Sequence, residues 1–356
     1  MKPSRSVFSA SRFSGGFLIA ASLAITAACL NASPARAVTI DFVTVGDPGN
    51  VADTNGYGSV ADSFQISKYE ITNALYTDFL NSVDPTGANP YYIYTNVWGA
   101  NDYGSIHFYQ GNANGSKYQL YNNKGDKPVN AVSWFDAARV ANWLHNGGGS
   151  GDTENGAYTL NGAYTGNAVA RNPGAQCYIP TESQWYKAAY YKGGGQNAGY
   201  WSYSTQSNSV PSPVTATSVG VGQVGATSPV TSGNYANYDD AAVWNSAGGD
   251  ETTVGSNGGP SAYGAFDMTG NVSEWNDFDG LTGDYYRGLR GGSSRNGSSI
   301  QASSFRERYA SSGESLNLGF RLAAPVAPVP EPSTYAMAFA GLACGGFSVW
   351  RRRRRA

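Results

Sequence analysis

Residues 263–275 read YGAFDMTGNVSEW, and this stretch decides how the rest of the chain is interpreted. It brings the carboxylates of Asp267 and Glu274, an asparagine amide and the backbone carbonyls around Gly270 into one short segment. A hard cation such as calcium prefers a mixed shell of carboxylate, amide and carbonyl oxygens. The alternative is a Gly-Asn turn that joins two strands, with both carboxylates solvated and Trp275 in the core.

Five shorter motifs accompany this stretch. They are ISKYEITN at 66–73, PVNAVSW at 128–134, IPTESQW at 179–185, RGGS at 290–293 and NLGFR at 317–321. In this order, over about residues 60–324, the motifs resemble the formylglycine-generating enzyme (sulfatase-modifying factor) family. The resemblance implies an α+β fold like that of C-type lectins, rich in irregular structure, with three helices packed on small sheets.

The resemblance also implies a set of metal ligands. Calcium would be held by the side chains of Asp267 and Glu274 and by the carbonyls of Gly270 and Val272, and it would connect loops rather than do chemistry. Asn237 corresponds to a second calcium site, for which a solvated acidic loop remains an alternative. We therefore expect calcium to raise the melting temperature, and Glu274→Ala to lower it and to abolish the response to calcium.

Formylglycine-generating members of the family oxidise a cysteine of a sulfatase with molecular oxygen, using copper held by two cysteine thiolates. Both cysteines lie between the RGGS and NLGFR motifs, but residues 293–317 contain no cysteine here. Ile300 and Phe305 stand about where the thiolates belong, and Cys177 cannot supply a pair by itself. We expect copper, and formylglycine-generating activity with it, to be absent.

Two functions stay open. One is a binding or structural module without catalytic residues, which takes a peptide or a glycan in the groove that the enzymes use. The other is an oxidoreductase of the family that modifies a protein or peptide by altered chemistry. Arg306, Glu307 and Arg308 either line that groove or form a surface charge cluster, and Tyr91 and Tyr92 either stack on a ligand or pack beside the core.

The charge of the chain excludes one class of partner. Residues 38–330 contain 14 Lys and Arg against 24 Asp and Glu, a net charge near −10. Such a surface repels nucleic acid and is compatible with cation binding. With only two histidines in the chain, a His-rich metal centre is not expected either.

The two ends of the chain are targeting segments rather than parts of the fold. Residues 1–37 have a basic start, a short apolar run and an A-x-A cleavage signal, which is typical of a secretory signal peptide. Residues 325–356 contain Pro-Glu-Pro at 330–332, an apolar run and five terminal arginines, and resemble a PEP-CTERM sorting segment read by an exosortase. We expect a domain at 38–324 that is secreted to the cell surface or extracellular matrix. The C-terminal helix would be its only contact with the membrane, as a transient or a permanent transmembrane anchor.

Local patterns predict the elements between these ends. Helices are expected to begin after Thr72, Ser133 and Thr181, each of which stands at an N-cap position. Strands are expected in 38–60 and 64–69, and strand fragments at 158–160 and 178–179. Residues 87–127 and 193–233 lack helical periodicity and are predicted to be irregular surface segments.

Overall fold

The computed structural model describes residues 39–96, 105–166, 169–245, 248–277 and 285–326. The chain divides into two units, residues 1–37 and 38–356, of which the first lies outside the described residues. The predicted signal peptide therefore lies outside the described residues, and so does the predicted sorting segment apart from residues 325 and 326. Within the described residues, no helix is long and apolar enough to cross a membrane.

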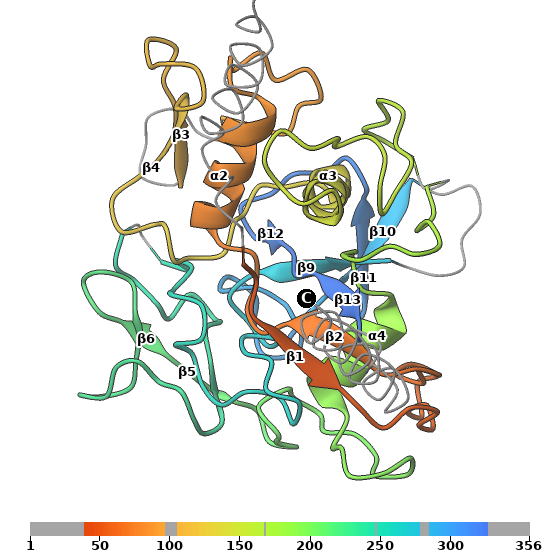
Figure 1. Ribbon diagram of the computed structural model, residues 1–356. Helices are drawn as coiled ribbons and strands as arrows, with labels where there is room; N and C mark the ends of the chain where they lie inside the picture. The colour runs from red at the N-terminus through yellow and green to blue at the C-terminus, as the bar shows by residue number, and fades with distance from the viewer. Residues whose placement is uncertain (1–38, 97–104, 167–168, 246–247, 278–284, 327–356) are drawn as a thin grey trace, which may run out of the picture. The chain divides into compact units, whose positions relative to one another are not determined.

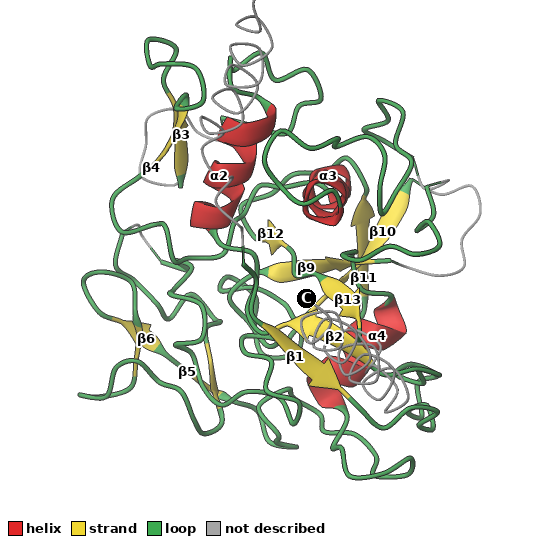
Figure 2. Cartoon of the chain, in the orientation of Figure 1, coloured by secondary structure: helices red, strands yellow, loops and turns green. Residues whose placement is uncertain are grey.

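Three helices begin where their capping residues predict. They are α2 (Asn73–Val83), α3 (Trp134–His145) and α4 (Glu182–Tyr190), coloured red in Figure 2. The Ser133 and Thr181 side chains each accept a hydrogen bond from the backbone N–H three residues later. The side chain of that later residue accepts a hydrogen bond from the backbone N–H of Ser133 or Thr181 in return, so α3 and α4 both start with a capping box. These contacts satisfy backbone N–H groups that a helix start otherwise leaves unpaired.

Two small sheets form the frame of the domain. One is antiparallel, in the order β1 (Phe42–Val45), β2 (Phe64–Ser67), β13 (Ala323–Pro325). The other has the order β11 (Glu307–Ala310), β10 (Tyr286–Arg290), β9 (Ser273–Asn276), β12 (Leu318–Gly319), with β12 parallel to β9. In the view of Figure 1, α2 and α3 are drawn above β9 and α4 is drawn below it.

The core is aromatic and lies between these elements. Trp134, Trp143 and Trp185 come from α3 and α4, and Trp275 comes from β9; all four are fully buried. Trp275 donates its indole N–H to the carbonyl of Val132 at 2.8 Å. Each buried indole removes a large apolar area from water. Trp134, Trp185 and Trp275 belong to the sequence motifs, so these motifs contribute directly to the core.

The predicted irregular segments contain more structure than expected. Within 87–127, β3 (Ile106–Phe108) and β4 (Tyr118–Leu120) form an antiparallel hairpin next to α2, and Ile106 and Tyr118 are buried. Residues 97–104 of this segment lie outside the described residues. Runs of three residues are too short to leave a clear alternation in the sequence, which explains why the hairpin was missed.

The segment 193–233 is mostly exposed, as predicted, but it also takes part in short strands. These are β5 (Ser212–Pro213) with β8 (Tyr235–Ala236), and β6 (Thr215–Ala216) with β7 (Gly222–Gln223). Val214 and Val230 anchor the segment because both side chains are buried. The expected fragments at 158–160 and 178–179 appear as single bridges, Tyr158 to Arg171 and Tyr178 to Ala323.

Candidate functional site

The Glu274 carboxylate lies on β9 and is held by protein donors. Arg321 donates from Nε to Oε2 and from Nη2 to Oε1, both at 2.6 Å, and the Trp185 indole N–H donates to Oε2 at 2.6 Å. Glu274 and Arg321 are fully buried. A bidentate Arg–carboxylate pair without solvent is a strong, specific contact, and it uses both Glu274 oxygens without a metal ion.

Asp267 precedes β9 and is also buried, with a left-handed backbone at φ +55°. Its carboxylate accepts hydrogen bonds from the Gly255 N–H and, at 2.9 Å, from the Asn257 amide. Burial raises the pKa of Asp267 to about 6. The alternative of a simple Gly-Asn turn with solvated Asp267 and Glu274 is therefore wrong in that respect, whereas Trp275 does lie in the core, as that alternative required.

Asn237 and Gly270 meet at a very close backbone approach. Gly270 has φ +87°, and a Cβ added there would lie 2.2 Å from the Asn237 carbonyl oxygen. That carbonyl accepts the Asn271 N–H at 2.8 Å, and the two asparagine side chains are joined by a 3.1 Å hydrogen bond. The structure thus brings Asn237 and Gly270 together, with buried Val272 two residues further on.

Glu70 is a member of this buried cluster that the sequence did not single out. Its side chain is 2% exposed, and burial together with nearby Asp267 and Glu274 raises its pKa well above the usual range. Asn271 donates to Glu70 Oε2 at 3.3 Å. The signal was present in the sequence, because Glu70 belongs to the ISKYEITN motif and Arg321 to NLGFR.

The buried cluster has some features of a calcium site and lacks others. The cluster contains three carboxyl groups, those of Glu70, Asp267 and Glu274, and a single guanidinium, that of Arg321. Glu70 Oε1 and Asn237 Oδ1 are buried acceptors without a hydrogen-bond partner among the described residues, which is how a cation ligand would appear. In the described part of the chain, however, no group of three His, Cys, Asp or Glu side chains converges as a metal site. A calcium shell here would therefore depend on amide and carbonyl oxygens, and Glu274 fits it least.

A second ionic network organises the segment between RGGS and NLGFR. Glu182, at the start of α4, accepts hydrogen bonds from Arg290 at 2.7 and 3.0 Å and from Arg306 at 2.7 Å. Arg290 also donates to the carbonyls of Ser303 and Phe305. Arg306 is thus part of a structural network, unlike Glu307 and Arg308, which are exposed on β11.

Two apolar side chains stand about where the family resemblance places the copper thiolates. Ile300 and Phe305 are half-buried apolar side chains. Cys177 is buried, and burial raises the pKa of its thiol to about 12, so the thiolate that binds soft metals is disfavoured at neutral pH. Cys29 and Cys344, the other two cysteines of the chain, lie outside the described residues.

A cleft of about 460 Å³ lies at the N-terminal end of α3. We call it the tyrosine cleft, and it is lined by Tyr91, Tyr92, Thr95, Ser133, Asp136, Tyr164, Ser312 and Glu314. Small-molecule sites usually have volumes of about 300–1,000 Å³. The two tyrosines of the predicted pair differ in their surroundings. Tyr91 packs against the core, whereas Tyr92 is 63% exposed.

Three chain segments build the tyrosine cleft. The 89–94 loop is closed by Asn89, whose side chain bonds both the N–H and the carbonyl of Tyr94. The 311–315 loop is fixed to α3 because the Trp134 N–H donates to the Ser311 carbonyl at 3.0 Å. The turn before Tyr164 is held by Arg139, which donates to the Ala163 carbonyl at 2.9 Å. Defined backbone contacts therefore position the lining residues.

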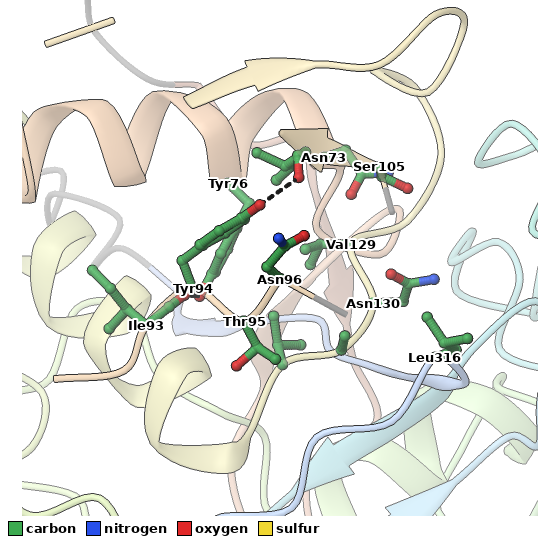
Figure 3. A pocket seen from close by; sticks show the side chains of 13 residues that line it. Asn73, Tyr76, Ile93, Tyr94, Thr95, Asn96, Ser105, Val129, Asn130 and Leu316 are labelled. Atoms are coloured by element: carbon green, nitrogen blue, oxygen red, sulfur yellow. Dashed lines mark hydrogen bonds between the residues drawn. The ribbon is translucent and has the colours of Figure 1, made fainter. Parts of the chain in front are cut away.

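A smaller cavity of about 30 Å³ lies next to the tyrosine cleft and shares Thr95 with it. Figure 3 shows the side chains of Asn73, Asn96 and Asn130 around it. In its lining, the Tyr76 hydroxyl donates to the Ile93 carbonyl at 2.6 Å. This volume holds one or two water molecules but no larger ligand. Asn73 Oδ1, which is buried without a protein partner among the described residues, is an acceptor for such a water.

Comparisons with known proteins agree with these features. Residues 48–326 match the model of the sulfatase-modifying factor enzyme 1-like domain, and residues 328–355 match the PEP-CTERM protein-sorting motif. The sorting motif implies an exported, cell-surface-associated protein recognised by exosortase-type machinery. No curated protein sequence matches the chain.

Similar solved structures bear on the fold alone. CarF is 21% identical with a TM-score of 0.50, over 81% of this chain and 99% of CarF. Treponema denticola variable protein 1 is 20% identical with a TM-score of 0.47, over 80% and 95% of the two chains. PvdO from Pseudomonas aeruginosa is 17% identical with a TM-score of 0.41, over 81% and 93%. Since the family model covers most of the chain, this protein belongs to the sulfatase-modifying factor enzyme 1-like family and carries a PEP-CTERM sorting motif.

Proposed function

We propose that this protein is an exported binding module of its family, displayed at the cell surface or in the extracellular matrix, without formylglycine-generating activity. The observation that carries the binding role is the tyrosine cleft, in which Tyr92 and Tyr164 are 63% and 54% exposed beside a cavity of about 460 Å³. Exposed tyrosine rings offer apolar faces and hydroxyls to a glycan or a peptide at low entropic cost.

The absence of oxidase activity is supported by the residues where copper would bind. Copper(I) needs soft thiolate ligands, and residues 293–317 contain none. The half-buried side chains of Ile300 and Phe305 offer no metal ligand in their place. The oxidoreductase alternative would be supported if the purified chain bound copper or iron stoichiometrically and consumed oxygen in the presence of a cysteine-containing sulfatase peptide.

The binding role is tested by calorimetry of the full chain against a panel of neutral and charged oligosaccharides and extended peptides. We expect at least one probe to bind, and Tyr164→Ala to weaken its binding by about three- to tenfold, since one aromatic contact contributes about 0.5–1.5 kcal/mol. Tyr109→Ala is the matched control, because Tyr109 is 46% exposed but does not line the cleft. Equal losses in both variants, or no binding by any probe, would contradict the proposal.

We further propose that calcium stabilises the buried cluster. The support is the excess of carboxyl groups over guanidinium groups in the cluster, together with the oxygens of Glu70 and Asn237 that have no hydrogen-bond partner among the described residues. Asn237, Asp267 and the carbonyls near Gly270 and Val272 would hold the ion, whereas Glu274 would contribute through its pair with Arg321. The ion would supply positive charge and connect the 237 and 267–272 segments.

Calcium is expected to raise the melting temperature of the full chain, because an ion that binds only the folded state shifts the unfolding equilibrium. Thermal unfolding is followed by circular dichroism in two samples, one with the chelator EGTA and one with calcium at about 100 times its dissociation constant. The free energy of unfolding should be about 2.7 kcal/mol higher in the sample with calcium. Asp267→Asn should reduce this increment. Glu274→Ala is also expected to lower the melting temperature, but this decrease would not report on calcium. The substitution removes the ion pair with Arg321 and therefore destabilises the fold whether or not calcium binds. Identical melting curves with and without calcium would remove the ion from the proposal.

A further inference from the structure

The charges that face the tyrosine cleft are all negative. Asp136 and Glu314 are the charged residues among its described lining, and no Lys or Arg accompanies them. The nearest base on α3 is Arg139, whose guanidinium is engaged by Glu154 at 2.8 and 3.3 Å. Arg139 is thus paired with Glu154. The carboxylates that line the cleft are Glu314 and Asp136, and Asp136 also accepts hydrogen bonds from the Ser133 N–H and hydroxyl at 2.7 Å.

Burial makes these two negative charges costly. Asp136 is 3% exposed, and burial, followed by repulsion from Glu314, raises its pKa to about 7. Burial also raises the pKa of Glu314. A cation placed between two such carboxylates would lower the cost of both, because opposite charges attract strongly where solvent is partly excluded.

The rim of the cleft shows a second feature, which points to the shape of the ligand. Tyr92 has a left-handed backbone at φ +56°, which is rare for a bulky residue and costs about 1–3 kcal/mol. Burial does not offset this cost, since Tyr92 is 63% exposed. The strained loop instead presents the Tyr92 ring beside Tyr164, with ring centroids 5.7 Å apart and planes at 61°.

We propose that the tyrosine cleft binds an amino sugar, with its primary ammonium group toward Asp136 and Glu314 and its ring against Tyr92 and Tyr164. This inference rests on the proposed binding function and specifies its ligand. The apolar C–H face of a pyranose fits an exposed tyrosine ring, and an ammonium group fits both the carboxylates and the negative faces of the aromatic rings. The Ser312 and Thr95 hydroxyls, which also line the cleft, suit the hydroxyl groups of the sugar.

A sugar fits these observations better than a lysine side chain. Lysine would supply the same ammonium group, but its narrow aliphatic chain leaves most of a 460 Å³ cleft unfilled. It would also give the two exposed tyrosine rings no flat partner. The lysine peptide is therefore the alternative against which the proposal is measured.

The test is calorimetric titration of the full chain with three probes: a glucosamine tetramer, the corresponding N-acetylglucosamine tetramer and a tetralysine peptide. The glucosamine tetramer is expected to bind about tenfold more tightly than either of the others, the size of effect expected for one ionic hydrogen bond at a partly exposed site. Glu314→Gln should remove the preference for the free amine and leave binding of the acetylated tetramer unchanged. The control variant is Asp78→Asn, which alters an exposed carboxylate on α2 that does not line the cleft. It should keep the preference for the glucosamine tetramer.

The outcomes separate this inference from the proposed function. Equal affinity for the two tetramers, lost in Tyr164→Ala, would overturn the ammonium assignment while leaving the binding module intact. Tighter binding of tetralysine would overturn the sugar. A preference that persists in Glu314→Gln would place the amine elsewhere, and absence of binding by all three probes would refute the inference even if the wider panel contains a ligand. Circular dichroism of each variant establishes that it is folded.

Discussion

Arg321→Ala is expected to lower the free energy of unfolding by about 3–5 kcal/mol, because it leaves the buried Glu274 carboxylate without its partner. Arg321 is fully buried and connects three segments: it pairs with Glu274 on β9 and donates to the carbonyls of Ser67 at 3.0 Å and Phe266 at 2.8 Å. Its removal would therefore also leave the buried Ser67 carbonyl and the partly buried Phe266 carbonyl without this donor. Equilibrium unfolding in urea measures the change.

The matched control for this substitution is Arg308→Ala. Arg308 is exposed on β11, where its guanidinium lies over the Tyr286 ring at 5.1 Å. Exposed charges contribute little to stability, so a loss of about 1 kcal/mol or less is expected. If the two arginine variants lost the same stability, the buried pair would not be the connection between the sheets that its geometry indicates.

Gly270→Ala is expected to cost about 2–4 kcal/mol, from left-handed backbone strain and from overpacking together. At φ +87° an alanine is strained in any surroundings, and here its Cβ would also lie 2.2 Å from the carbonyl oxygen of Asn237. Backbone atoms cannot move aside as a flexible side chain does. We therefore expect the 237 and 267–272 segments to separate, with a reduced response to calcium in the same unfolding experiment.

Gly174→Ala separates the two causes. Gly174 has a similar φ of +80°, but nothing lies within 4 Å of an added Cβ. This variant should show the backbone strain alone, about 1–2 kcal/mol. A Gly270 variant no less stable than the Gly174 variant would show that the close approach to Asn237 relaxes at no cost.

The sequence predicted the elements whose signals are local. Thr72, Ser133 and Thr181 each marked a helix start, because a capping side chain acts within three residues of its own position. The fold class followed from the motifs, and the family model confirms it. The β3–β4 hairpin was missed, since its buried residues, Ile106 and Tyr118, pack on α2 rather than follow a pattern of their own.

The site was harder to predict because its partners are distant in sequence. Glu274 and Asp267 were singled out as oxygen ligands seven residues apart, but the group that meets Glu274 is Arg321, 47 residues later. The tyrosine cleft joins segments near 92, 136, 164 and 314. Nothing in the spacing of these residues indicates that they converge, because convergence depends on how the loops are fixed to α3.

The pairing of β13 with β2 joins the last described strand of the domain to one of the first. This strand ends at Pro325, and the sorting motif begins at residue 328. During synthesis, the sheet of β1, β2 and β13 therefore cannot be completed until the chain has been made almost up to the sorting motif. Proteolytic release beyond residue 327 would leave the sheet whole. A cut only a few residues earlier would remove a strand and expose the edge of β2 to pairing with other chains.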